Sequence, residues 1–271
     1  MRRYAPLHAS GAPKEPRESF VAAVTECCAV QMMHSMNPNG CAVFLDTLSP
    51  GTRSAFTRLG TRLRYAVGDV LIHEGDQTQE LVILHEGLVK VTARLDRERV
   101  LLRDIRIAGD IVGEVAAMGI GPRSATVTSC GDVSATVVPR NELESFFLAH
   151  PEASLALNRM LCDRLRRANR LRLELGAYPV AVRLARVLVE LAESHGHPRH
   201  TLRGPDWNRV RIGVSLSQSE FAALTATTTH TVHKALARLG KDRIITTGCR
   251  QTSIENMARL RDAAQLSDPA A

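Results

Sequence analysis

The hydrophobic pattern changes along the chain, and this change constrains the fold more than any other feature of the sequence. Between residues 62 and 139, short β-branched runs such as VLI at 70–72 and LVIL at 81–84 are separated by glycine-containing turns. Several short strands at near-regular spacing predict a compact antiparallel sandwich or barrel. From Pro151 to Gly176 the pattern is that of one long helix, with proline at its start and glycine at its end. We therefore expect an α+β protein.

The long helical segment carries a partly apolar stripe. Its members recur at three- and four-residue steps: Leu161, Leu165, Ala168, Arg172 and Leu175. Such a stripe can pack on the chain's own β domain, or it can form the seam of a coiled-coil dimer. We favour the dimer seam, because the helix is long and follows a small β domain. The chain is therefore expected to be a homodimer.

Other helices are expected on both sides of this segment. One covers Ala42–Leu59 and is interrupted or restarted near Ser49-Pro50-Gly51, and another begins with Asn141 as its N-cap. Tyr178-Pro179 ends the long helix, because proline suits the first turn of a new helix and disfavours helical angles in the residue before it. After that new helix, residues 194–207 read as a polar loop that holds three histidines, and Val210–Val214 as a strand.

A second pattern lies in the stretch LSQSEFAALTATTTHTVHKALARL, residues 216–239. Ser217 followed by Glu220 predicts a capping box at the start of one short helix, and Thr228 caps a second helix after a tight turn. The second helix buries a leucine and valine face and exposes hydroxyl, imidazole and ammonium groups. An ordinary helical hairpin has the same caps, but the exposed face and a pI near 9.4 favour docking in the major groove of DNA. Ile244–Thr246 and Thr252–Ile254 could pair as a wing.

The loop GEVAAMGIGPRSATV, residues 113–127, places a carboxylate, a guanidinium and a hydroxyl close together. Together with YAVGDVLIHEGD at 65–76 and the stretch at 216–239, it resembles the CRP/FNR family of bacterial transcription regulators. All three stretches occur in that family's order and spacing, from about Ala42 to Leu260. The resemblance implies a cyclic-nucleotide-binding-type β-roll, a long dimerisation helix and a C-terminal winged helix-turn-helix.

The resemblance also implies a ligand, cyclic AMP or cyclic GMP, and its contacts. Arg123 and Ser124 would bind the cyclic phosphate with backbone N–H groups near Val115 and Ala125, and Glu114 would accept from the ribose hydroxyl. Gly113 would let the backbone approach closely. The alternative is that Glu114 and Arg123 pair with each other across an empty loop.

The chain departs from the family at several positions that contact the purine of the ligand or the DNA. Asn169 can contact the purine, but the neighbouring Ala168 replaces a hydroxyl residue, so the choice of nucleotide stays open. Ala226 stands where the family's turn often has glycine. The residues expected to contact double-stranded DNA are Ser217, Gln218, Thr228, Thr229, His230, Thr231, His233 and Lys234. Thr229 and His230 replace an arginine and a glutamate, which predicts a different half-site. RNA polymerase is a further expected partner.

Composition excludes several classes of protein. No apolar run reaches about 18 residues, so no transmembrane helix and no membrane partner are expected, and the start of the chain lacks the apolar core of a signal peptide. A cytoplasmic location follows, in which the six cysteines are reduced thiols. Neither a nucleophile–base–orienter set nor a phosphate-binding Walker A loop is found, so the chain is not expected to be an enzyme.

Two other functions remain open. One is a cyclic-nucleotide-binding scaffold protein that no longer reads DNA; the other is a redox-switched regulator of the same family. The second would need a cluster at Cys27, Cys28, Cys41 and Cys130, whose spacing fits poorly, and no metal or haem is expected. The expected organisation is listed from the N-terminus: an extension that is partly disordered at 1–41, the β-roll at 42–150, the dimerisation helix and hinge at 151–178, and the DNA-binding domain at 179–271.

Overall fold

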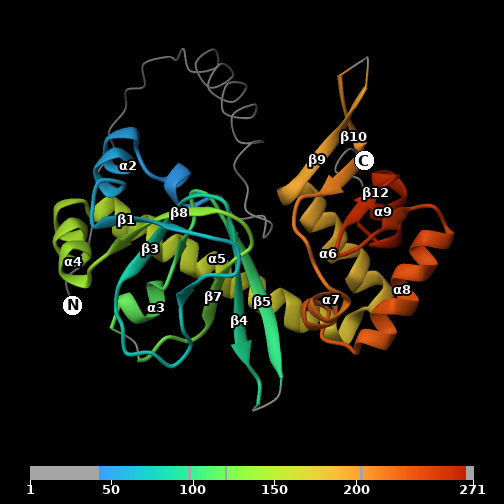
Figure 1. Cartoon of the computed structure of the whole chain (residues 1–271), viewed down its shortest axis with the longest axis horizontal. Coiled ribbons are helices and arrows are strands. Elements are labelled where there is room, and N and C mark those ends of the chain that lie inside the picture. The colour runs from blue at the N-terminus through green and yellow to red at the C-terminus, as the bar shows by residue number, and fades with distance from the viewer. Residues whose placement is uncertain (1–42, 97–98, 120, 202–203, 267–271) are drawn as a thin grey trace, which may run out of the picture. The chain divides into compact units, whose positions relative to one another are not determined.

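The computed structural model describes residues 43–96, 99–119, 121–201 and 204–266 (Figure 1). The predicted N-terminal extension, with Cys27, Cys28 and Cys41, lies outside these residues. The first described elements are a 3₁₀ helix η1 (Phe44–Thr47) and helix α2 (Pro50–Phe56). Ser49 caps α2 by accepting a hydrogen bond from the backbone N–H of Thr52 at 3.3 Å.

Eight strands follow and form two four-stranded antiparallel sheets (Figure 1). One sheet has the order β1-β8-β3-β6 and the other the order β2-β7-β4-β5. The strands are β1 (Thr61–Tyr65), β2 (Val70–Ile72), β3 (Leu81–Glu86), β4 (Leu88–Arg94), β5 (Val100–Ile107), β6 (Ile111–Val112), β7 (Thr126–Ser129) and β8 (Val133–Val138). The expected β-roll is thereby confirmed. β1 lacks an apolar run because four of its five residues are exposed.

The two sheets enclose one hydrophobic cluster, and helices cover a second. The first includes Ile72, Leu84, Val89 and Val127. The second joins Phe44 and Phe56 to β3, to α4 (Arg140–Ala149) and to the first turns of α5 (Pro151–Ala177). The prediction that Asn141 caps α4 is wrong. Pro139 is the N-cap, because its backbone is extended and Arg140 already begins the helix.

The C-terminal part begins with α6 (Val180–His195), which Pro179 precedes in an extended conformation. The polar loop predicted at 194–207 is wrong. These residues continue into a hairpin of β9 (Gly196–Thr201) and β10 (Gly204–Ile212), which is mostly exposed and so needs no apolar alternation. His195 is buried at the end of α6 rather than solvated.

The helix-turn-helix consists of α7 (Gln218–Leu224) and α8 (Thr229–Lys241). The predicted wing is present as β11 (Ile245–Thr247) and β12 (Thr252–Ile254), which extend the β9–β10 hairpin into one sheet, and α9 (Met257–Ala263) follows. The cluster beneath α7 and α8 also contains Leu102 and Ile105 of β5. Among the described residues, no helix is long and apolar enough to cross a membrane.

Candidate ligand pocket and DNA-reading surface

The loop after β6 turns sharply at Gly113 and enters the short helix α3 (Glu114–Ala117). Gly113 has φ +82°, a left-handed conformation that favours glycine. A Cβ atom there would lie 2.6 Å from Nη1 of Arg123 and 2.9 Å from Cδ1 of Ile72. Both the backbone turn and the close approach of Arg123 therefore depend on this glycine.

Arg123 is buried, with 4% of its surface exposed, and three acceptors hold its guanidinium. Its Nε donates to Oγ1 of Thr78 at 2.9 Å, its Nη1 to the carbonyl of Gly113 at 3.1 Å and its Nη2 to Oε2 of Glu80 at 3.0 Å. Burial lowers the pKa of Arg123, and the charge of Glu80 acts against that change. Since a guanidinium has five N–H donors, two remain available to a ligand.

Glu114 does not pair with Arg123, so the alternative in which these two side chains pair with each other across the loop is wrong. Oε1 of Glu114 instead accepts from Nη1 of Arg164 on α5 at 2.6 Å. Nη2 of Arg164 also donates to the carbonyl of Ile111 at 3.2 Å. We define the cassette as residues 113–125. The long helix is thus tied to the cassette by one charge-assisted contact, and to β6 just before it by one backbone contact.

These residues surround one small cavity. Of the predicted ligand contacts, it brings together Gly113, Glu114, Val115, Arg123, Ser124 and Ala125, and Arg106 and Arg164 also line it. Asn169 does not line it and lies further along α5. The cavity measures about 80 Å³, which is below the roughly 300–1,000 Å³ typical of small-molecule sites.

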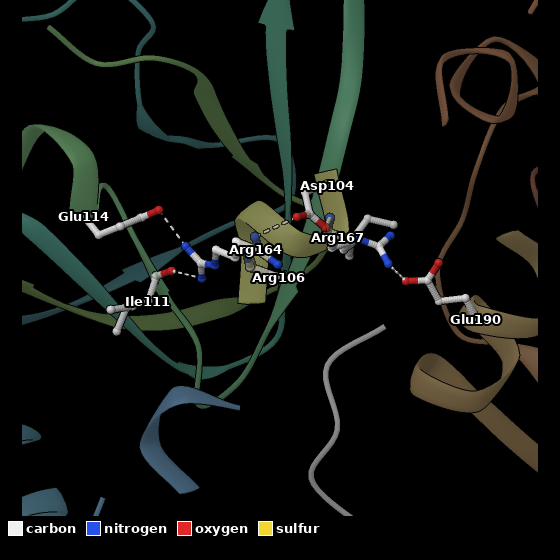
Figure 2. Close-up of polar contacts among 8 residues, drawn as sticks. Asp104, Arg106, Ile111, Glu114, Arg164, Arg167 and Glu190 are labelled. Carbon is white, nitrogen blue, oxygen red and sulfur yellow. Dashed lines mark hydrogen bonds and ion pairs between the residues drawn. The ribbon is translucent and has the colours of Figure 1, made fainter. Parts of the chain in front are cut away.

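Further ion pairs continue from the cassette towards α6, as Figure 2 shows. Arg106 pairs with Asp104 on β5 at 2.6 Å, and Arg167 on α5 pairs with Glu190 on α6. Burial raises the pKa of Glu190 to about 7, although Arg167 opposes this change. Asp104, Arg167 and Glu190 line a neighbouring cavity of about 320 Å³ between β5, α5, α6 and α7.

Histidine and cysteine residues supply no metal site in the described part of the chain. There, no group of three or more His, Cys, Asp or Glu residues could hold an ion. His85 is half-buried, and its Nε2 lies 2.7 Å from Oγ1 of Thr136, so it is part of the sheet's hydrogen bonding. Burial raises the pKa of the Cys130 thiol, which disfavours the thiolate needed for ligation.

The helix-turn-helix has the predicted caps. Oγ of Ser217 accepts from the N–H of Glu220 at 3.3 Å, and Oε2 of Glu220 accepts from the N–H of Ser217 at 2.7 Å. Oγ1 of Thr228 accepts from the N–H of Thr231 at 3.3 Å. Ala226 in the turn has φ +46°, a strained angle for alanine that costs about 1 kcal/mol.

The start of α8 presents the predicted reading face. Thr229, His230, His233 and Lys234 are all exposed. Nε2 of Gln218 lies 3.3 Å from Nδ1 of His233, so the first helix orients a side chain of the second. The opposite face packs inward through Val232, Leu236 and Leu239. This arrangement can offer several side chains to base edges at once.

Comparison with known proteins identifies the family of each of the two domains. The family model of the cyclic nucleotide-binding domain matches residues 62–150, and that of the Crp-like helix-turn-helix domain matches residues 182–263. A CRP-like cAMP-activated global transcriptional regulator of Mycobacterium tuberculosis (strain H37Rv) is 32% identical over 190 residues, which cover 70% of this chain and 82% of the relative. The chain belongs to the CRP/FNR family of transcriptional regulators.

Other CRP/FNR proteins match over a similar span. The transcriptional regulator LdrP of Thermus thermophilus is 28% identical over 74% of this chain and 95% of its own. The crystal structure of TTHB099, a CRP-family transcriptional regulator from the same species, superposes with a TM-score of 0.61 at 25% identity, covering 77% of this chain and 100% of that one.

In this CRP/FNR regulator, β4 also touches the helix-turn-helix. Nζ of Lys90 lies 2.6 Å from Oε1 of Glu220 and donates to the carbonyl of Ser215 at 2.9 Å. Burial disfavours ionisation of Glu220, but its hydrogen bonds with Lys90 and Ser217 outweigh burial and lower its pKa. The carboxylate of Glu220 therefore takes part in the capping box with Ser217 and also pairs with Lys90.

Sequence reasoning missed the partners of the cassette. Thr78 and Glu80 precede β3 in a segment that carries no recognisable motif, and Arg164 is one of several arginines in LCDRLRRANR. The helical phase of α5 decides which arginine faces the cassette. The sequence signal that could have selected Arg164 is its position four residues after the buried Met160, on the packed face of the helix.

Proposed function

We propose that this chain is a homodimeric transcriptional regulator whose affinity for double-stranded DNA is controlled by a cyclic nucleotide, cyclic AMP or cyclic GMP, held in the β-roll. The observation that carries the proposal is the buried guanidinium of Arg123, fixed by three acceptors beside Glu114 and Ser124. A buried cation with unused donors in a cavity suits an anionic ligand.

The ligand's contacts follow from the chemistry of these groups. Arg123 and the hydroxyl of Ser124 donate to the cyclic phosphate, together with backbone N–H groups of Val115 and Ala125. Glu114 accepts from a ribose hydroxyl. Because Glu114 now accepts from Arg164, ligand binding changes the contact that ties α5 to the cassette.

The dimer would form through the outer face of α5. Leu155, Leu165 and Leu173 on this helix are 56%, 63% and 75% exposed, so α5 presents several large apolar side chains that a partner helix could cover. Leu161 from the predicted stripe is instead partly packed against the β-roll. We therefore centre the proposed seam on Leu165, with Asn169 close to it, so that Asn169 can reach a nucleotide once α5 shifts or the partner helix docks.

The DNA contacts would come from Ser217 and Gln218 at the start of α7 and from Thr228 to Lys234 around the start of α8. Exposed Lys234 would add a phosphate or base contact, and the basic charge of the chain favours association with DNA. RNA polymerase is proposed as a further partner, since a DNA-bound regulator must act on transcription through it or by blocking it.

Titration calorimetry with cyclic AMP and cyclic GMP tests the ligand, and binding of labelled genomic fragments at fixed salt tests the coupling. Arg123→Ala should remove most nucleotide affinity, because each charge-assisted hydrogen bond is worth roughly 1.5–3 kcal/mol. Arg53→Ala, which removes an arginine paired with Asp46 away from the cavity, is the matched control.

Two results would count against the proposal. Equal nucleotide affinity in Arg123→Ala and the wild type would place the ligand elsewhere. Equal DNA affinity with and without saturating nucleotide would leave a DNA-binding protein that the ligand does not control.

A further inference from the structure

One charged side chain in the cassette cavity has no part in the contacts proposed above. The charged residues that line it are Arg106, Glu114, Arg123 and Arg164. Arg123 is assigned to the phosphate and Glu114 to the ribose, and Arg164 pairs with Glu114. Arg106 remains, and it is 6% exposed on β5.

Arg106 is paired rather than isolated. Its Nη2 lies 2.6 Å from Oδ2 of Asp104, two residues earlier on the same strand. Asp104 lines the neighbouring cavity together with Ala168 of α5, so the pair reaches from the cassette towards the long helix (Figure 2). A buried ion pair is weak evidence of stability, because desolvation of both charges offsets their attraction.

A nucleotide anchored at Arg123 and Glu114 has only its base left to contact Arg106. The base edges of purines differ in the order of donors and acceptors. Guanine presents the acceptor O6 beside the donors N1–H and N2–H₂, whereas adenine presents the donor N6–H₂ beside the acceptor N1. Arginine only donates and a carboxylate only accepts, so Arg106 beside Asp104 fits the guanine order. Adenine in the same pose would set donor against donor and acceptor against acceptor.

We propose that Arg106 and Asp104 read the base of the ligand and select guanine, so that cyclic GMP binds in preference to cyclic AMP. This inference rests on the proposed function, since it assumes that a cyclic nucleotide occupies the cassette. A mismatched base edge lowers affinity by about 10- to 100-fold, which is the preference expected for cyclic GMP.

The test is calorimetry on the full chain with cyclic GMP, cyclic AMP and cyclic IMP, which has guanine's O6 and N1–H but lacks its 2-amino group. We expect affinities in the order cyclic GMP, cyclic IMP, cyclic AMP. Asp104→Asn keeps the shape of the side chain and should shrink the preference, and Arg106→Leu should abolish it. Arg53→Leu, taken from an Arg–Asp pair of 2.5 Å outside the cavity, should keep the wild-type preference.

The outcomes separate this inference from the function on which it rests. Cyclic AMP binding as tightly as cyclic GMP would overturn the inference alone, and absence of binding by either would overturn both. If Arg106→Leu does not fold, the wild-type order and Asp104→Asn decide, and an unchanged preference in Asp104→Asn would overturn the base-reading role. Cyclic di-GMP carries the same base, and tighter binding than that of cyclic GMP would overturn the mononucleotide assignment.

Discussion

Two titratable groups on α6, the buried His195 and the partly buried Glu190, should give opposite pH dependences that cancel in the wild type. Burial raises the pKa of Glu190 from 4.5 to about 7. Burial lowers the pKa of His195 from 6.5 to about 4, and in the described part of the chain its Nε2 has no hydrogen-bond partner. In the folded chain both groups are therefore neutral between pH 4.5 and 6.5, whereas both are charged in the unfolded chain.

The sign of each contribution follows from proton binding. Glu190 holds a proton in the folded state that it loses in the unfolded state, so the stability it contributes falls as pH rises. His195 gains a proton only in the unfolded state, so its contribution falls as pH falls. Each group changes the free energy of unfolding by about 1.4 kcal/mol per pH unit in this window, or about 3 kcal/mol across it.

Urea unfolding at about pH 4.5, 5.5 and 6.5 tests this account in the wild type, Glu190→Gln, His195→Leu and the double variant. Glu190→Gln should lose stability on acidification relative to the wild type, because only the His195 effect remains. His195→Leu should gain stability on acidification, and the double variant should match the wild-type slope. Glu144→Gln controls for the loss of an exposed carboxylate on α4. If the free energy of unfolding depended on pH in the same way in all variants, burial of Glu190 and His195 could not be the cause of the pKa changes.

Three further outcomes are expected. Ala226→Gly should raise the free energy of unfolding by about 0.5–1 kcal/mol in urea titrations, because glycine adopts φ +46° without strain, and a loss of stability would contradict the strain. Leu165→Glu should shift sedimentation towards monomer, whereas Leu148→Glu, 84% exposed on α4, should not; a dimeric Leu165→Glu would place the seam elsewhere. Lys90→Ala breaks the pair with Glu220. Saturating nucleotide should then change the DNA affinity of this variant less than that of the wild type, as DNA titration would show. Calorimetry should find the same nucleotide affinity in both proteins.

Local patterns in the sequence were sufficient for the caps of the helix-turn-helix and for the core strands, although the cap predicted for α4 at Asn141 was wrong. The capping box of Ser217 and Glu220 joins residues three positions apart, so its geometry follows from helix start rules alone. The hairpin at β9 was missed because its residues are mostly exposed, and exposed strands leave no apolar alternation to detect.

The contacts of the cassette could not be predicted in the same way. Arg123 meets Glu80 across 43 positions, and Glu114 meets Arg164 across 50. Such pairs depend on sheet register and on the rotation of α5 about its axis, and each is decided by the packing of the whole domain. The resemblance to a family identified the cassette, but not which side chains hold its charges.

The strands β4 and β5 contribute side chains both to the cassette cavity and to contacts with the C-terminal half. Val91 and Arg106 line the cassette cavity, whereas the adjacent Lys90 and Ile105 contact the helix-turn-helix or its core. The regions matched by the two family models are therefore not interchangeable modules. A chimaera that joined this β-roll to another family member's DNA-binding half would keep Leu102 and Ile105 buried and Lys90 paired only if that half supplied matching apolar residues and a carboxylate. Recombination within the family would then have to carry the outer faces of these two strands along with the C-terminal half.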